Sequence, residues 1–557
     1  MLPTRAVGLR RIALIGLAGA LAVTTAACAS ERGSGGSASD TFIFGAAGAP
    51  KNFDPIFNDD GESFRPARQM FDTLVTYKPG TTELEGGLAT AWTPSNGNTT
   101  WTFTLRQGVK FHDGTPFNAA AVCFNFDRWY NMKGAAAQSQ MIYYGDVFEG
   151  FAHNEGDISG EPVYKSCEAK DDHTAVLNLN KAKGAFPDAF GLTSLSMSSP
   201  DALKKWDADT VTQSGEAFTY PAYATDHPTG TGPYKFDSFD KANNTITLVR
   251  NEDYWGEKAK TAKLIFKIIP DENARKQELA AGTIDGYDFP SPADYNSLKD
   301  AGNQVLIRPA FNILYLGINQ KNNPKLQDVR VRQAIEYAIN KDQLVKNRLP
   351  QGAYAQDQFL PNNVPGHTDA VAKYSYNPDT ARQLLAQAGA SDLTLNFYVP
   401  TEVTRPYMPN PVDIAAAITD DLKAVGIKVN VVQEPWNGGY KDSVQKAGKQ
   451  DLHLLGWTGD YADAGNFVGT FFGRPKPEFG FDNPQIFNAL STADAQTTPD
   501  AKKAAYENAS VLISQYVPAV PLSSSPPGIV VRSDVQGLVP TPLTDERFYT
   551  VTKGNKG

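Results

Sequence analysis

The sequence predicts an α/β protein of more than one domain, on the evidence of its length and of one strand–helix–strand unit. A chain of 557 residues is longer than one compact core normally supports, so roughly two or three domains are expected. Residues 393–399 (LTLNFYV) alternate as a strand does, apolar residues recur at helical spacing over 414–425, and residues 427–432 (IKVNVV) read as a second strand. These three elements in succession predict a parallel βαβ crossover.

The other elements are predicted from the same periodicities and from capping residues. Alternating apolar side chains predict strands over residues 100–105, 245–249, 263–269 and 452–455. Residue types that commonly cap helices predict helix starts at Asn118, Ser199, Asp271 and Asp328. Gly282 is expected to end the helix that begins after Asp271.

The overall charge excludes one broad class of function. The net charge is −9 and the isoelectric point is about 5.3. A protein that binds nucleic acid needs a basic surface to displace the counterions of the phosphates. We therefore expect no nucleic-acid partner.

The first residues have the pattern of an export signal. Arg5, Arg10 and Arg11 precede an apolar stretch over residues 12–23, which is too short to span a bilayer stably. Small residues then lead to Cys28, in a pattern that resembles a lipobox. We interpret residues 1–28 as a lipoprotein signal peptide, with lipid on Cys28.

Ordinary cleavage after Ala29 is the alternative, because residues 27–29 form an A-x-A pattern. On the lipoprotein interpretation, residues 29–40, which are rich in Gly and Ser, are expected to be a flexible tether. The predicted location is extracytoplasmic, with the lipid anchored to the outer face of the cytoplasmic membrane.

Lipidation of Cys28 would leave two cysteines, Cys123 and Cys167. In an exported protein such a pair is by default a disulfide. Two buried free thiols are the alternative.

No catalytic motif is found. The sequence lacks the G-x-S-x-G, H-E-x-x-H, P-loop and G-x-G-x-x-G patterns, and its six histidines are scattered. Asp460 and Asp463 give only a weak indication of glycoside hydrolysis. We therefore predict a binding protein and not an enzyme, without a cofactor or a metal.

Seven motifs, in order and at matching spacing, resemble the family 5 solute-binding proteins of ABC importers. They begin at Phe71 (FDTLVTY), Thr100 (TWTFTLRQGVKFHDGTPFNAAAV), Thr229 (TGTGPYKFDSFD), Leu248 (LVRNEDYWG), Ala280 (AAGTIDGYDF), Asp328 (DVRVRQAIEYAINKDQLV) and Ala519 (AVPLSSS). One departure is Ala121, where the family usually has an acidic residue. The resemblance covers nearly all of the mature chain.

The resemblance implies a fold like that of type II periplasmic binding proteins (cluster C), with two lobes and a hinge that close over a ligand. Residues 41–86, 219–312 and 505–557 are expected to form a discontinuous first lobe. Residues 87–218 are expected to form a small extra domain, and residues 313–504 the second lobe.

Two local motifs resemble those of bacterial dipeptide-binding proteins. The motif TRPYMPNP at Thr404 implies that Arg405 holds the carboxylate of the ligand, and GWTGD at Gly456 implies that Asp460 holds its amino group. Apolar walls are expected from Trp457, Tyr461 and Trp436. The alternatives are a surface arginine at Arg405 and a turn-capping aspartate at Asp460.

The predicted function is therefore an extracytoplasmic solute-binding lipoprotein. It would act as a monomer and deliver dipeptides or short oligopeptides to the permease of an ABC importer. The same fold could instead bind a sugar oligomer or another small solute. A secreted hydrolase is the remote alternative.

Overall fold

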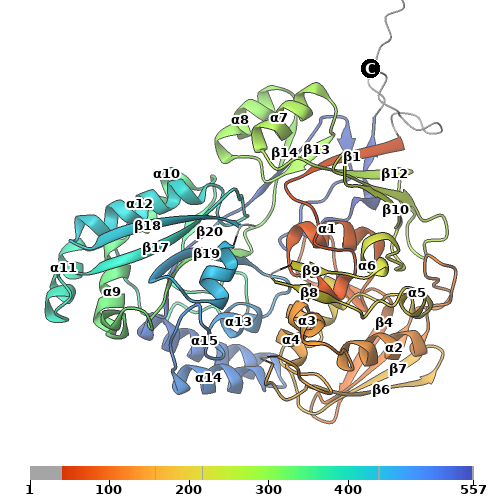
Figure 1. Ribbon diagram of the computed structural model, residues 1–557, viewed down its shortest axis with the longest axis horizontal. Helices are drawn as coiled ribbons and strands as arrows, with labels where there is room; N and C mark the ends of the chain where they lie inside the picture. The colour runs from red at the N-terminus through yellow and green to blue at the C-terminus, as the bar shows by residue number, and fades with distance from the viewer. Residues whose placement is uncertain (1–39, 157, 216, 437–438, 555–557) are drawn as a thin grey trace, which may run out of the picture.

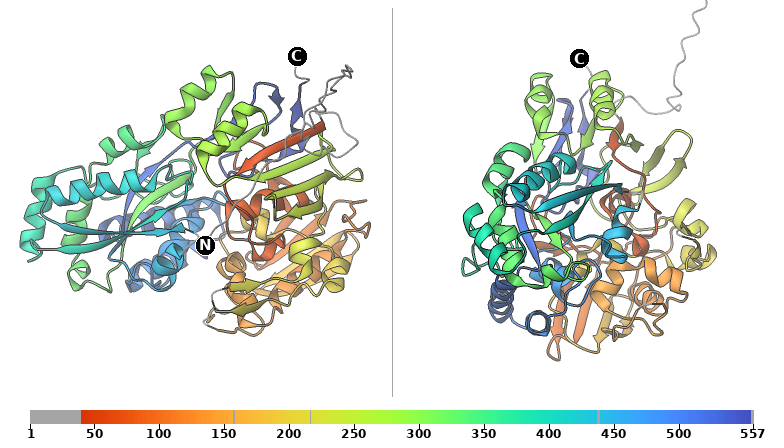
Figure 2. Two further views of the ribbon diagram at one scale, coloured as in Figure 1. Left: turned by 45° about the horizontal axis from the view of Figure 1, so that its top comes forward. Right: turned by 60° about the vertical axis from the view of Figure 1, so that its left-hand side comes forward.

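The computed structural model describes residues 40–156, 158–215, 217–436 and 439–554. Two large sheets with their helices form two lobes, and a four-stranded sheet lies beside the first lobe (Figure 1). Figure 2 shows the same division from two other directions, with the second lobe on one side and the other two units together. This arrangement is the two-lobe α/β fold that the family resemblance implies.

The first lobe is built on a sheet of seven strands in the order β10-β11-β12-β1-β13-β21-β14. The strands are β1 Thr41–Ala46, β10 Tyr234–Asp240, β11 Thr245–Arg250, β12 Lys263–Ile268, β13 Gly286–Asp288, β14 Gln304–Ile307 and β21 Gly528–Val531. The helices of this lobe are α1 Gly61–Met70, α6 Ala222–Asp226, α7 Glu272–Ala281 and α8 Tyr295–Asp300. Helix α7 follows the predicted cap Asp271, and Gly282 ends it in the left-handed conformation (φ 70°).

The second lobe is built on a sheet of six strands in the order β16-β20-β15-β19-β17-β18. The strands are β15 Asn312–Ile318, β16 Tyr354–Ala355, β17 Thr394–Thr401, β18 Lys428–Pro435, β19 Leu452–Thr458 and β20 Ala519–Ser524. Its helices are α9 Val329–Ala338, α10 Lys341–Arg348, α11 Pro378–Gln387, α12 Pro411–Ala424, α13 Val468–Phe472, α14 Pro484–Asp494 and α15 Pro499–Tyr516. Strands β17 and β18 pair in parallel on either side of α12 in the chain, which confirms the predicted crossover.

The small unit contains a four-stranded sheet in the order β4-β5-β7-β6. Its elements are β4 Ala89–Ser95, β5 Thr100–Leu105, β6 Tyr164–Asp171, β7 Thr174–Leu179, α2 Ala119–Tyr130, α3 Ala135–Gln140, α4 Ile142–Phe148 and α5 Pro200–Lys205. The three two-stranded sheets of the described chain pair β2 Val75–Tyr77 with β3 Leu84–Gly86, β8 Thr212–Ser214 with β9 Ala217–Thr219, and β22 Val535–Gln536 with β23 Thr552–Lys553.

The chain passes between the two large sheets after β14 and again after β20, and hydrogen bonds tie these two crossings together. The Asn312 side-chain amide donates to the Ser525 carbonyl (2.7 Å) and accepts from the Ser525 amide (3.0 Å). Just before this point, the buried Arg308 guanidinium pairs with Asp288 (2.8 Å) and Glu546 (2.6 Å). The two crossings therefore form one joined junction between the lobes.

The return to the first lobe lies further along the chain than the predicted boundary at residue 505. Strand β20 pairs with β15 and β16 in the second sheet, and only β21 pairs with strands of the first sheet. The break falls at residues 525–527, where Pro526 and Pro527 cannot donate to a ladder. We therefore place the boundary between β20 and β21.

The expected disulfide joins Cys123 in α2 to Cys167 in β6, with their Cα atoms 5.1 Å apart. The two cysteines are 44 residues apart, so the bond restricts a long loop of the unfolded chain. On the chain-entropy relation, such a loop corresponds to about 4 kcal/mol of stabilisation.

Replacing both cysteines, as Cys123→Ser with Cys167→Ser, should lower the free energy of unfolding by about 4 kcal/mol, measured by urea denaturation. The reduced wild-type protein serves as the control and should unfold near the same urea concentration. Unchanged denaturation of the double variant, or two reactive thiols in the non-reduced mature protein, would contradict the assignment.

Candidate functional site

A cavity of about 260 Å³ lies between the lobes and is called here the interlobe cavity. The first lobe contributes α1 as far as Arg68 with the two residues before it, and also Phe289, Leu543 and Thr544, while the small unit contributes α4. The second lobe contributes residues 405–407, Trp436, Lys441, residues 455–460, Thr470, Phe471, Lys476 and Glu478. Arg405, Trp436, Trp457 and Asp460, four of the five residues predicted to contact a ligand, therefore line one cavity.

Asp460 follows the end of β19, in a loop held by Asn466. The side-chain oxygen of Asn466 accepts from the Asp460 amide (2.9 Å) and from the Trp457 indole (3.2 Å). Gly456 and Gly459 allow close packing here, because a Cβ at Gly456 would clash with Tyr407 and one at Gly459 with Phe311. The stretch from Gly456 to Asn466 thus builds the wall that presents Asp460.

The Asp460 carboxylate receives hydrogen bonds only from neutral groups among the described residues. The Tyr143 hydroxyl donates to one oxygen (3.1 Å), and the Asn466 amide donates to the other (3.3 Å). Burial raises the pKa of Asp460 to about 6, although both hydrogen bonds oppose this shift. A cationic ligand group beside this carboxylate would compensate for its lost hydration.

Arg405 lies in a short turn that is closed by two backbone hydrogen bonds with Met408 (3.1 and 2.9 Å). Its guanidinium lies 4.6 Å from the ring centroid of Trp436, which stacks on Tyr440 at 6.0 Å. In the described part of the chain no carboxylate lies within 4.0 Å of this guanidinium. Arg405 therefore faces the cavity with an aromatic neighbour and without an anionic partner there.

The aromatic residues divide between this cavity and another. The half-buried Trp457 packs edge-on against Phe471 (5.8 Å) and near Tyr143 (6.4 Å), and forms a flat wall of the interlobe cavity. Trp436 is 8% exposed, so it belongs both to the core and to the cavity lining. Tyr461 points instead into a second cavity.

This second cavity, of about 580 Å³, is called here the side cavity and lies between the small unit and α13–α15. It adjoins the interlobe cavity, because four residues line both: Ile142, Tyr143, Asp146 and Thr470. Its charges are paired across the units, as Lys183 with Asp494 (2.8 Å) and Arg474 with Asp146 (3.2 Å). Together the two cavities leave space beyond Asp460.

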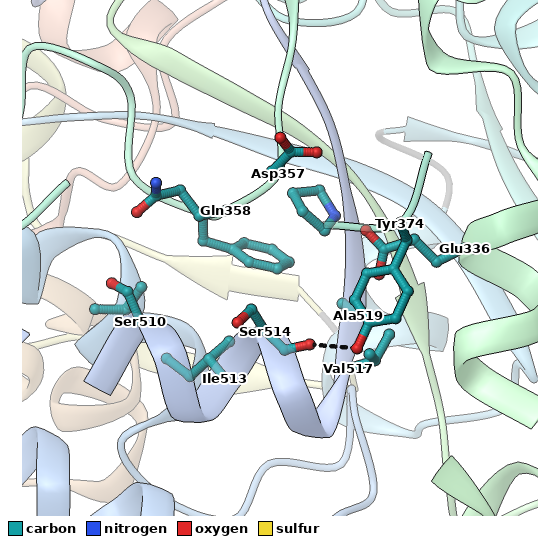
Figure 3. A pocket seen from close by; sticks show the side chains of 12 residues that line it. Glu336, Asp357, Gln358, Tyr374, Ser510, Ile513, Ser514, Val517 and Ala519 are labelled. Atoms are coloured by element: carbon teal, nitrogen blue, oxygen red, sulfur yellow. Dashed lines mark hydrogen bonds between the residues drawn. The ribbon is translucent and has the colours of Figure 1, made fainter. Parts of the chain in front are cut away.

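A third, much smaller cavity of about 10 Å³ lies within the second lobe, between Gln358, Tyr374 and α15 (Figure 3). The Tyr374 hydroxyl donates to the Ser514 carbonyl there (3.1 Å). This volume corresponds to about one water molecule, so it does not qualify as a ligand site.

Several residues of the interlobe cavity were not predicted from the sequence. Tyr143 and, from behind the wall, Asn466 orient Asp460, and besides the ion-paired Arg65 three further cations line the walls: Arg68, Lys441 and Lys476. Burial lowers the pKa of each of these three cations. Only Asn466 had a sequence signal, because it belongs to the polar stretch that follows β19.

The described ranges hold no group of three or more His, Cys, Asp or Glu residues arranged to bind a metal ion. None of the helices described is both long and apolar enough to cross a membrane. Cys28 lies outside the described residues.

The hydrogen bond from Tyr143 should measurably affect the ionisation of Asp460. Tyr143→Phe removes a donor that favours the charged form, so the pKa of Asp460 should rise above its value of about 6. The pKa of Asp460 is measured from its carboxyl ¹³C chemical shift during a pH titration. The signal is assigned by its absence in Asp460→Asn. Tyr144→Phe, at the adjacent position, is the control; an equal shift in both variants would contradict the assignment.

Comparison with known proteins assigns the family. Residues 83–478 match the family described as bacterial extracellular solute-binding proteins, family 5 Middle. Heme-binding protein A of Haemophilus influenzae is 30% identical over 93% of this chain and 93% of its own length. The dipeptide-binding protein of Escherichia coli is 30% identical over 92% of this chain and 94% of its own.

A solved structure has the same fold. It is an ABC transporter-associated periplasmic binding protein of Helicobacter pylori in complex with the peptide STSA, with a TM-score of 0.76 and 26% identity over 92% of this chain and 98% of that one. The family match covers more than half of the chain, and the relatives span nearly all of it. The protein therefore belongs to family 5 of the bacterial extracellular solute-binding proteins.

Proposed function

We propose that this protein binds dipeptides or short oligopeptides outside the cytoplasm and delivers them to the permease of an ABC importer. The observation that carries the proposal is the pair Arg405 and Asp460, which line one interlobe cavity and have no ion-pair partner among the described residues. A peptide in solution is a zwitterion, so it supplies the carboxylate that Arg405 lacks and the ammonium that Asp460 lacks. Burying either charge without such a partner is costly.

The chemistry of each anchor suits its role. The planar guanidinium of Arg405 can form two parallel hydrogen bonds to a carboxylate, and Asp460 accepts hydrogen bonds from an ammonium. The walls formed by Trp436 and Trp457 contact ligand side chains through flat apolar surfaces, which constrain their chemistry only loosely. The site is therefore suited to peptides of varied sequence.

The names of the relatives support a peptide ligand. The Escherichia coli relative is named a dipeptide-binding protein, and the Helicobacter pylori structure holds a four-residue peptide. The side cavity beside Asp460 offers room for ligands longer than a dipeptide. We therefore include short oligopeptides in the proposal.

The alternatives fit the two anchors less well. A neutral sugar oligomer would leave Arg405 and Asp460 both unpaired. The Haemophilus influenzae relative is named a heme-binding protein, but a heme brings carboxylates and no ammonium, so Asp460 would remain uncompensated. The family consists of solute-binding proteins, and no hydrolase is proposed.

The membrane anchor is part of the same proposal. Lipid on Cys28 and the tether of residues 29–40 would keep the protein close to the permease. Cys28→Ala should then release the protein from the membrane fraction into the soluble fraction, as followed by immunoblotting. A wild-type protein that is already soluble and begins at Ser30 would contradict lipidation and support cleavage after Ala29.

The assignment of the two anchors is tested by blocking each end of the ligand. Loss of one partner of a buried charge pair costs on the order of 2–5 kcal/mol, so Arg405→Ala should weaken dipeptide binding roughly 30-fold to 3,000-fold. Amidation of the peptide carboxyl group should weaken binding to the wild type strongly and to Arg405→Ala little. Acetylation of the peptide amino group should likewise weaken binding to the wild type strongly and to Asp460→Ala little.

Titration calorimetry with dipeptides, longer peptides, hemin and cello-oligosaccharides measures these affinities. Asp460 must be ionised to hold the ammonium, so affinity should fall as the pH drops through about 6, and Asp460→Asn should lose this dependence. Arg382→Ala, at an exposed position of the same lobe, is the control and should bind as the wild type does. If each blocked peptide loses as much affinity in its matched variant as in the wild type, Arg405 and Asp460 are not the anchors.

A further inference from the structure

The carboxylate end of the proposed site has two cations rather than one. The Lys441 ammonium lies 5.5 Å from the ring centroid of Trp436, the same indole that lies 4.6 Å from the Arg405 guanidinium. All three residues line the interlobe cavity. The aromatic ring of Trp436 thus brings two positive charges to one region of the wall.

The residue before Lys441 is attached to the core of the second lobe. The preceding residue, Tyr440, is fully buried, and its hydroxyl donates to the Leu454 carbonyl of β19 (2.7 Å). Tyr440 also stacks on Trp436. The turn that carries Lys441 is therefore attached to the strand that leads to Asp460.

Lys441 lacks an ionic partner in the described part of the chain. No carboxylate there lies within 4.0 Å of its ammonium. The acidic groups that face it across the cavity, Asp59 and Asp60, are engaged elsewhere: Asp59 pairs with Lys51, and Asp60 caps α1 by accepting from the Glu62 and Ser63 amides. Burial lowers the pKa of Lys441, as expected for a cation that has lost water without gaining an anion.

One terminal carboxylate compensates one cation. With Arg405 on the terminal carboxylate, Lys441 would remain uncompensated unless the ligand carries a second anion next to it. We infer that Arg405 and Lys441 form a two-cation site for peptides whose C-terminal residue is Asp or Glu. This inference rests on the proposed function and deepens it, because it names the class of peptide that is favoured.

A different role for Lys441 would be attraction to Asp59 and Asp60, which would help the lobes to close. That role predicts an equal loss of affinity for every ligand when the charge is removed. Selection for an acidic C-terminal residue predicts a loss confined to acidic ligands. The ratio of the affinity for an acidic ligand to that for a neutral ligand therefore distinguishes the two roles.

The test compares the isosteric dipeptides Ala-Glu and Ala-Gln by titration calorimetry at pH 7.5. The wild type should bind Ala-Glu about 10-fold or more tightly than Ala-Gln, which is the effect of one added charge-assisted hydrogen bond. Lys441→Met, which keeps the aliphatic chain, should reduce this ratio to within about 3-fold. Lys441→Arg should restore most of it.

Two controls make the test specific. Lys446→Met removes an exposed cation from the adjoining helical turn and should leave the ratio as in the wild type. A second pair of dipeptides, Glu-Ala and Gln-Ala, places the same added charge at the other end of the ligand. The wild type should bind these two with similar affinity. An equal preference for Glu-Ala would mean attraction by overall charge and would overturn the inference.

The remaining outcomes are also decisive. If dipeptides bind but the wild type does not distinguish Ala-Glu from Ala-Gln, this inference fails and the proposed function stands. The inference also fails, and the proposed function stands, if Lys441→Met is folded by circular dichroism and retains the wild-type ratio of affinities for Ala-Glu and Ala-Gln. If no peptide binds at all, the proposed function fails, and the inference fails with it.

Discussion

The position of Asp460 depends on the antiparallel pairing of β15 with β19. Strand β15 begins at Asn312, immediately after the chain has crossed from the first lobe, and the residue opposite Asn312 is Thr458 at the end of β19. The Gly459 amide donates to the Phe311 carbonyl (3.0 Å), which extends the contact by one residue. The loop that carries Asp460 therefore opens at the junction of the lobes, where α4 of the small unit can reach it through Tyr143.

The interlobe cavity combines charges that the protein has satisfied with charges that it has left for a ligand. Near the junction, Arg65 and Arg308 share Asp288, and Glu546 completes this buried network. Such pairs stabilise the geometry only because each partner is present. Asp460, Arg405 and Lys441 lack ionic partners in the described ranges, and a ligand of opposite charge would offset the hydration that each has lost.

The elements that depend on local interactions were predicted well. The caps Asn118, Ser199, Asp271 and Asp328 each accept a hydrogen bond from a backbone amide two or three residues later. Such contacts lie within a short window of sequence, so residue type and spacing reveal them. The same is true of the crossover from β17 through α12 to β18, which depends on two periodicities.

The features that depend on distant partners were predicted less completely. Strands β20 and β21 are both fully buried, and only their partner strands, some 200 residues earlier, decide that they belong to different sheets. In the irregular loop after β19, no periodicity indicates that Asp460 faces one cavity and Tyr461 another. The sequence motif therefore indicated that residues of this loop line a pocket, but not which cavity each side chain faces.

The sequence by itself determined the class of this protein, because export signals, capping residues, strand periodicity and family motifs are all local patterns. It also singled out Arg405 and Asp460, since each lies in a motif of its own. Only the tertiary structure decided what surrounds them: Tyr143 donates to Asp460 across 317 positions of chain, and Lys441 joins Arg405 at one indole. The first contact is created when the small unit packs against the second lobe, and the second when separate loops of the second lobe meet, so no spacing within the sequence encodes either one.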